Sequence, residues 1–203
     1  MKFKLSLLTL GLAAASIGSV HAQGISDDVI RIGHITDMSG VYSDLDGPAG
    51  TEAIKMAVAD AGGEINGKKI EVMGFDHQNK ADIASAKARE WIDQNKVDVI
   101  FGGTNSAAAL AVAKVAAEKK VPYIQLGAGS TQITNEQCTP FTIHYAYNTK
   151  ALANVTGSAV VQEGGKDWFF ITADYAFGHS LEKDTANVVT KSGGSVKGQV
   201  RVP

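Results

Sequence analysis

The chain has 203 residues, and its 19 lysines and arginines against 21 aspartates and glutamates give a formal net charge of −2 at pH 7. This length is enough for one domain or one and a half. A near-neutral balance gives no electrostatic basis for binding a polyanion, so the composition argues against a nucleic-acid partner. The only cysteine, Cys138, points to a missing disulfide partner, an intermolecular bridge or a free thiol.

Residues 1–22 predict a secretory signal peptide. A basic start (MKFK) precedes an apolar stretch from Leu5 to Val20, and Val20-His21-Ala22 supplies the small residues that a signal peptidase reads. A membrane anchor is the alternative, but the stretch is short and is diluted by Ala, Ser and Gly. We therefore expect cleavage before Gln23 and a soluble, monomeric mature protein in the periplasm.

Strand-like and helix-like stretches alternate along the chain after the signal. Apolar runs predict strands at 30–35, 69–75, 97–101 and 121–124, and apolar residues at helical spacing predict the helices between them. These helices carry Ile54, Ala57, Val58 and Ala61, then Ala84, Ala88 and Trp91, then Ala108, Val112, Val115 and Ala116. The alternation predicts βαβ units, and hence an α/β fold with a doubly wound parallel sheet.

A second block begins after Pro140. It is expected to contain a helix with Leu152, Val155 and Ala159, a strand at 168–171, a helix with Leu181, Val188 and Val189, and a terminal strand. This block has too few strands to close a domain. Together with the unpaired cysteine and an ending that reads as mid-strand, it predicts a fragment.

Candidate ligand-binding residues lie in the loops after three of the predicted strands, at 36–48, 102–106 and 127–131. Ligands of open parallel sheets bind beyond the carboxyl ends of the strands. In the second loop, Thr104, Asn105 and Ser106 precede a helix, whose free N–H groups suit a carboxylate; a plain helix cap is the alternative. The third loop (Gly127, Ala128, Gly129, Ser130) could receive an ammonium or hydroxyl group. Tyr42 in the first loop either covers the ligand or packs on the surface.

The sequence offers no catalytic or metal-binding set. Neither G-x-x-x-x-G-K-[ST] nor G-x-S-x-G occurs, and histidines 34, 77, 144 and 179 are scattered. Nothing assembles a nucleophile, a base and a group that orients the base. We therefore predict a protein that is not an enzyme and that holds no metal and no cofactor.

The order of several short motifs resembles the type I periplasmic binding proteins of the leucine/isoleucine/valine-binding family. The motifs are IGHITDMSG at 32–40, AIKMA at 53–57, NGKKIE at 66–71, GGTNS at 102–106 and VPYI at 121–124. Residues 138–149 (CTPFTIHYAYNT) resemble a branch of this family associated with aromatic and related carboxylates. The resemblance extends through the whole mature chain.

The resemblance implies two α/β lobes joined by three hinge strands, closing on a solute that is passed to an inner-membrane ABC permease. It places lobe 1 at 23–145 and the start of a truncated lobe 2 at 146–203. The solute would be a small carboxylate: a branched-chain or other amino acid, or an aromatic acid. A ligand-sensing domain of a receptor, or an exported α/β hydrolase whose catalytic residues lie elsewhere, are the alternatives.

The resemblance also implies roles for single residues. Thr104, Asn105 and Ser106 match the loop that binds the carboxylate. Gly127, Ala128, Gly129 and Ser130 match the loop that meets an amino group, but Gly129 stands where a threonine is usual, which argues against an amino-acid ligand. The remaining expected contacts are aromatic: Tyr42, Tyr145, Tyr175 and Phe177. Phe177 replaces a usual tyrosine, and Cys138 would pair with a cysteine outside this sequence.

Overall fold

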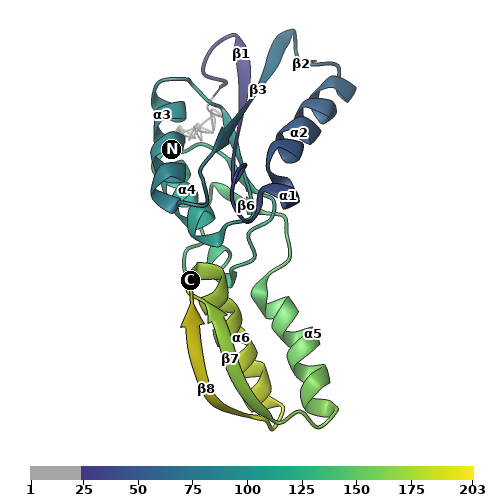
Figure 1. Cartoon of the computed structure of the whole chain (residues 1–203). Coiled ribbons are helices and arrows are strands. Elements are labelled where there is room, and N and C mark those ends of the chain that lie inside the picture. Colours follow the sequence, from purple (N-terminus) through teal and green to yellow (C-terminus); the bar gives the residue numbers. More distant parts are fainter. Residues whose placement is uncertain (1–23) are drawn as a thin grey trace, which may run out of the picture.

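The computed structural model describes residues 24–203 and contains two sheets, one of six strands and one of two. Figure 1 places the larger sheet and its helices in one unit and the smaller sheet with two helices in another, joined by chain segments between them. We call these the first unit and the second unit. The predicted signal peptide lies outside the described residues.

The first unit is built on a sheet with strand order β2-β3-β1-β4-β5-β6. Its strands are β1 (Val29–Thr36), β2 (Glu64–Ile65), β3 (Lys68–Asp76), β4 (Val99–Gly102), β5 (Tyr123–Gln125) and β6 (Thr142–His144). All neighbouring pairs are parallel except β2 and β3. Those two form a hairpin at Asn66-Gly67, where both residues have positive φ, as a two-residue turn of the hairpin type requires.

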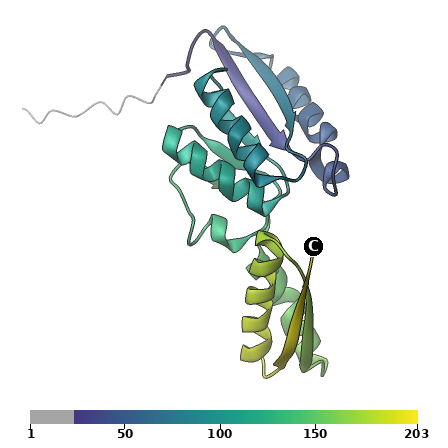
Figure 2. The same cartoon turned by 60° about the vertical axis from the view of Figure 1, so that its left-hand side comes forward.

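Helices lie on both faces of this sheet: α1 (Ser43–Asp46), α2 (Pro48–Asp60), α3 (Ala81–Asp93), α4 (Ser106–Lys119) and the short 3-10 helix η1 (Thr131–Ile133). Figures 1 and 2 show α3 and α4 side by side, with α2 on the other side of the sheet. The apolar stripes predicted for α3 and α4 are buried in the main core, together with Ile35, Ile100 and Tyr123. These elements confirm the predicted doubly wound α/β fold.

The stripe predicted on α2 is buried only in part. Ile54 and Val58 are half-buried, whereas Ala57 and Ala61 are exposed, and Thr51 is the helix's buried residue. Thr51 reaches the sheet through its side chain, since its Oγ1 lies 2.9 Å from Nδ1 of the buried His34. The first turn of α2 therefore attaches the helix to β1, and its later turns are buried only in part.

The second unit consists of α5 (Thr149–Gln162), β7 (Asp167–Ala173), α6 (Ala176–Lys191) and β8 (Ser195–Val202). Strands β7 and β8 are parallel, and α5 packs along α6 (Figure 2). The helix stripe expected at Leu152, Val155 and Ala159 is wrong as a buried face, because all three residues are exposed. Helix α5 instead buries a row of small residues and one valine at its end: Ala153, Gly157 and Val161.

Gly157 explains this choice of face. A Cβ built on Gly157 would lie 3.2 Å from Cγ1 of Val188 on α6, so the absent side chain lets the two helix backbones approach closely. Larger side chains such as Val155, which is 74% exposed, cannot occupy that contact. The predicted residues on α6 fare better: Val189 is fully buried, and Leu181 and Val188 are half-buried.

Two further observations concern the part of the chain that the structure describes. Within residues 24–203, none of the helices has the length and apolar character that crossing a bilayer requires. Cys138 is exposed and forms no disulfide.

Candidate ligand-binding site

The first candidate loop is held in place by a buried carboxylate. Asp37 is fully buried, and its two oxygens accept hydrogen bonds from the backbone N–H groups of Gly40 (2.8 Å) and Tyr42 (3.1 Å). A side chain on Gly40 would collide with those oxygens, since its Cβ would lie 2.6 Å from Oδ2 of Asp37. The backbone of Tyr42 is therefore fixed at the end of β1.

Asp76, at the end of the adjacent strand β3, holds the same loop from the other side. Its carboxylate accepts hydrogen bonds from Met38 N (2.9 Å), Gln78 N (2.8 Å) and Ser39 Oγ (2.6 Å). Burial alone would raise the pKa of Asp76, but these hydrogen bonds to the charged form outweigh it and lower the pKa below its usual value. Asp76 thus remains a charged acceptor for the loop.

In the second loop, Asn105 and Ser106 are committed to the protein's own structure. The Asn105 Oδ1 accepts a hydrogen bond from Ala108 N at 2.8 Å, which makes it the N-cap of α4, and its amide donates to Asn79. Ser106 is fully buried, and its Oγ accepts a hydrogen bond from Ser130 N at 3.2 Å. For these two side chains the structure favours the capping and bracing role over direct contact with a ligand.

Thr104 differs from its two neighbours. Its Oγ1 is buried and has no hydrogen-bond partner among the described residues. It lies against the third loop, because a Cβ on Gly127 would come within 2.7 Å of Thr104 Cγ2. The first backbone N–H groups of α4 also lack acceptors within the helix. Asn105 caps the N–H of Ala108, so the uncapped amides of this first turn are those of Ser106 and Ala107, next to the unpaired hydroxyl at the carboxyl end of β4.

The third loop is braced by two side chains that the sequence analysis did not select. Gln125 is fully buried; its Nε2 donates to the carbonyl of Gly103, and its Oε1 accepts from Ala128 N at 2.8 Å. His144 Nε2 lies 2.6 Å from the carbonyl oxygen of Ala128. The sequence signal that could have identified Gln125 is an amide directly after the predicted strand at 121–124. A polar side chain buried at such a strand end needs hydrogen-bond partners.

Aromatic side chains from both units come together near the third loop. The hydroxyl of Tyr42 in the first unit is hydrogen-bonded to that of Tyr175 in the second. Burial, and then the Tyr42 hydroxyl, raise the pKa of Tyr175, so its phenol stays protonated. The rings of Tyr175 and Phe177 lie 6.3 Å apart between centroids. Tyr42, Tyr175 and Phe177, three of the four predicted aromatic residues, thus come together.

Tyr145, the fourth, does not join them: it is 81% exposed. Tyr147 is found beside the loop instead. A Cβ on Gly129 would lie 2.9 Å from Cε2 of Tyr147 and 3.1 Å from Cε2 of Phe177. Tyr147 is itself 55% exposed. Strand β6 ends at His144, so the following residues leave regular strand geometry, and a position counted from the sequence motif does not fix which tyrosine lies beside the loop.

A buried polar layer lies beneath the first and second loops. His34 is fully buried with Nε2 unpaired, 3.8 Å from Asp46 Oδ1, and His77 is 1% exposed with Nδ1 unpaired. Burial lowers the pKa of both imidazoles, so they stay neutral near pH 7. Within residues 24–203, no group of three or more His, Cys, Asp or Glu side chains is placed to hold a metal ion.

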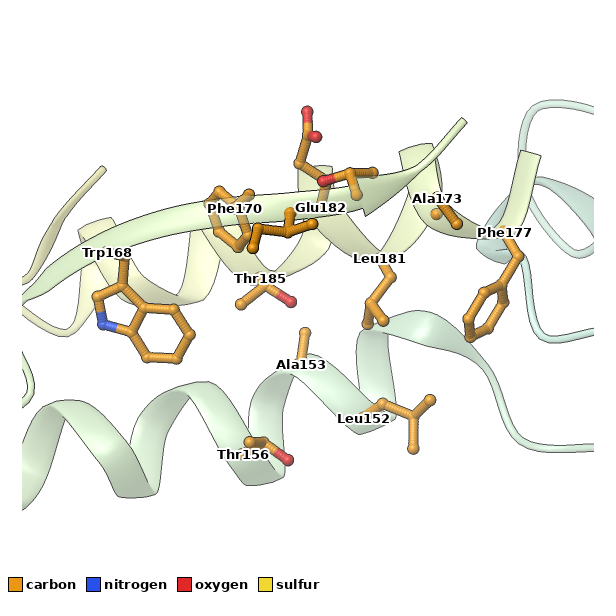
Figure 3. A pocket seen from close by; sticks show the side chains of 13 residues that line it. Leu152, Ala153, Thr156, Trp168, Phe170, Ala173, Phe177, Leu181, Glu182 and Thr185 are labelled. Carbon is orange, nitrogen blue, oxygen red and sulfur yellow. The ribbon is translucent and has the colours of Figure 1, made fainter. Parts of the chain in front are cut away.

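The second unit contains an open cavity of about 560 Å³ between α5, β7 and α6. Figure 3 shows its apolar lining, with Trp168 and Phe170 from β7 facing Ala153 and Leu152 on α5. Of the predicted site residues only Phe177 reaches it, and its lining includes no lysine, arginine or histidine. This cavity therefore offers a carboxylate no cationic side chain, and Glu182 in its lining carries the same charge as such a ligand.

Comparison with known proteins agrees with this fold. A family model described as periplasmic binding protein matches residues 29–203. A crystal structure of a periplasmic binding protein from Burkholderia mallei is 65% identical with a TM-score of 0.85, covering 87% of this chain and 47% of that one. A solute-binding protein of an ABC transporter from Rhodopseudomonas palustris BisB5, in complex with 3,4-dihydroxybenzoic acid, is 31% identical with a TM-score of 0.77, covering 87% and 48%.

A curated relative, Leu/Ile/Val-binding protein homolog 4 of Brucella abortus (strain 2308), is 22% identical over 186 residues, covering 86% of this chain and 44% of the relative. The chain thus spans about half the length of the relatives that it matches. The match to the family model includes both units, from β1 to the last described strand. The chain belongs to the periplasmic binding protein family.

Proposed function

We propose that the whole protein is the substrate-binding component of an ABC importer, which binds a small carboxylate and delivers it to an inner-membrane permease. Residues 23–145 form lobe 1, residues 146–203 begin lobe 2, and the solute sits between them. Residues 1–22 direct export to the periplasm. Support comes from the family membership and from a relative that is a solute-binding protein of an ABC transporter. The protein binds and releases its ligand without chemistry.

The single observation that carries the proposal is the unpaired, buried Oγ1 of Thr104. A buried hydroxyl without a partner costs free energy of about 1–3 kcal/mol. It stands at the N-terminus of α4, where free amides and the helix dipole favour an anion. A ligand carboxylate would accept a hydrogen bond from Thr104 Oγ1 and from these amides together.

The surroundings favour an aromatic acid over an amino acid. Tyr147 and Phe177 occupy the space that a side chain at position 129 would take, so the loop offers rings rather than a hydroxyl for an ammonium group. The hydroxyls of Tyr42 and Tyr175 are hydrogen-bonded to each other, and the Tyr175 ring lies near that of Phe177. In the proposed site these phenols would pair with a polar substituent on the ligand ring. The 3,4-dihydroxybenzoic acid in the complex of the Rhodopseudomonas palustris relative is an aromatic ring with hydroxyl substituents of this kind.

The test is a pair of isosteric substitutions, with binding of 3,4-dihydroxybenzoate measured by calorimetry. Thr104→Val removes the unpaired hydroxyl and should weaken binding by about tenfold or more, since a hydrogen bond to a charged group is worth about 1.5–3 kcal/mol. Thr156→Val, in the apolar cavity of the second unit, is the matched control and should bind normally. Equal affinity of both variants and the unsubstituted protein would remove Thr104 from the site.

A further inference from the structure

A compact polar cluster joins the two units beside the candidate site. Its members are Thr131 on η1, Thr149 at the start of α5, and Ser180 and Asp184 on α6. The Asp184 Oδ2 accepts hydrogen bonds from Thr149 Oγ1 at 2.6 Å and Thr131 Oγ1 at 3.0 Å. One carboxylate of the second unit therefore binds a hydroxyl of the first unit, on Thr131, and a hydroxyl of its own unit, on Thr149.

Ser180 completes the cluster. Its Oγ lies 2.9 Å from Thr131 Oγ1 and 2.9 Å from Thr149 Oγ1, and it accepts a hydrogen bond from Thr131 N at 3.2 Å. Thr149 is fully buried and Ser180 is 3% exposed. Hydrogen bonds to a charged acceptor are about twice as strong as neutral ones, and they are strengthened where water is excluded.

The cluster is connected directly to the third loop. Thr131 follows Ser130 in the chain, and the N–H of Thr149 donates to the carbonyl of Gly129 at 2.7 Å. The loop is thus tied to the cluster at Thr131 and again through Gly129. A change in the position of α6 would be transmitted to Gly129, against which Tyr147 and Phe177 lie.

We propose that Asp184 is a positioning residue that sets the angle between the two units and, through Thr131 and Thr149, the placement of the loop at 127–130. The carboxylate has two acceptor oxygens but no donor, so it fixes the directions of the hydroxyls that point at it. Thr149, Ser180 and Asp184 all belong to the second unit, and together they present hydroxyl and carboxylate oxygens to Thr131 of the first unit. Both hydrogen bonds of Thr131 Oγ1, to Asp184 and to Ser180, are kept only while the first unit holds its position against α6.

The neighbouring residue on α6 supplies a contrast. Lys183 also reaches across to the first unit, where its Nζ lies 3.3 Å from Glu136 Oε1, but these side chains are 69% and 58% exposed. An exposed ion pair contributes little and is screened by salt. Lys183→Gln is therefore a control that crosses the same interface without touching the cluster.

The experiment measures the distance between spin labels on the two units by pulsed electron resonance. The labels are attached to p-acetylphenylalanine introduced at two exposed positions, Lys114 on α4 and Glu163 at the end of α5, so that Cys138 is left untouched. Thr149→Val removes the hydroxyl at nearly constant volume, and Thr149→Ser keeps it. We expect one narrow distance distribution for the unsubstituted protein, for Thr149→Ser and for Lys183→Gln, and a broad or shifted one for Thr149→Val and Asp184→Leu.

If all variants give the same narrow distribution, the cluster does not set the angle, and the proposal is wrong. Circular dichroism would show whether Thr149→Val unfolds the protein. In that case Ser180→Ala replaces it as the test, because it deletes one hydroxyl of the cluster and must still broaden the distance distribution. Because this readout needs no ligand, it is independent of the proposed function. A second readout rests on the proposed function. For Asp184→Leu we expect the Kd of 3,4-dihydroxybenzoate to rise about tenfold, which corresponds to about 1.4 kcal/mol.

Discussion

The contact between Gly33 and Trp91 makes the packing of the first unit open to a quantitative test. Trp91 is 6% exposed, and its ring meets Phe75 edge-on with centroids 6.1 Å apart. A Cβ on Gly33, in the central strand β1, would lie 2.6 Å from Cε3 and 2.7 Å from Cζ3 of Trp91. Gly33→Ala therefore overpacks the core and should lower the free energy of unfolding by about 1–3 kcal/mol.

A double-mutant cycle separates this clash from any other effect of the new methyl group. Trp91→Ala alone should cost about 3–5 kcal/mol, because it leaves a cavity. In that background the methyl of Gly33→Ala enters vacated space and should cost close to nothing, so the coupling should be about 1 kcal/mol or more. Gly24→Ala, where an added methyl would meet nothing within 4 Å, is the matched control. Urea denaturation followed by circular dichroism gives the four values, and simple additivity would refute the packing account.

Three further predictions concern the cap, the buried histidines and the tyrosines. Asn105→Ala should destabilise the protein by about 1 kcal/mol in urea titrations, since it removes the N-cap of α4, and an unchanged midpoint would contradict this role. Burial lowers the pKa of His34 in the folded state, so as the pH falls below about 6.5 the unfolded chain binds the proton first. The free energy of unfolding should then fall by up to about 1.4 kcal/mol per pH unit. His34→Gln should make the free energy of unfolding depend less on pH. Tyr147→Ala removes the ring beside Gly129 and should weaken binding of 3,4-dihydroxybenzoate, whereas Tyr145→Ala, at a side chain that is 81% exposed, should not. The reverse order in calorimetry would place Tyr145 in the site instead.

The fold of the first unit follows closely from its sequence pattern. The predicted apolar residues of α3 and α4 form one core with Ile35 of β1, Ile100 of β4 and the half-buried Met73 and Phe75 of β3. The prediction failed on α5, where helical spacing marked Val155 but the buried face runs through Gly157. Helical periodicity locates a stripe of large apolar residues, whereas the contact with α6 depends on small ones, which periodicity alone does not select.

The candidate site was predictable by position but not by role. The rule that ligands meet the carboxyl ends of parallel strands selected the loops that contain Thr104 and Gly129, and these loops do lie together. The sequence could not separate Thr104 from Asn105, because any of the polar residues before α4 can cap it, and the backbone decides which one does. The cluster around Asp184 was not predicted at all, since its members come from segments whose proximity depends on how the two units meet.

The most direct test of the central claim is a thermal-shift measurement on the full-length protein with 3,4-dihydroxybenzoate and with leucine. A ligand present at about 1,000 times its Kd stabilises the folded state by about 4 kcal/mol. We expect a clear rise in Tm with the aromatic acid, which Thr104→Val reduces, and a smaller rise or none with leucine. No shift with either ligand would contradict the proposal that this protein binds a small carboxylate between its two units.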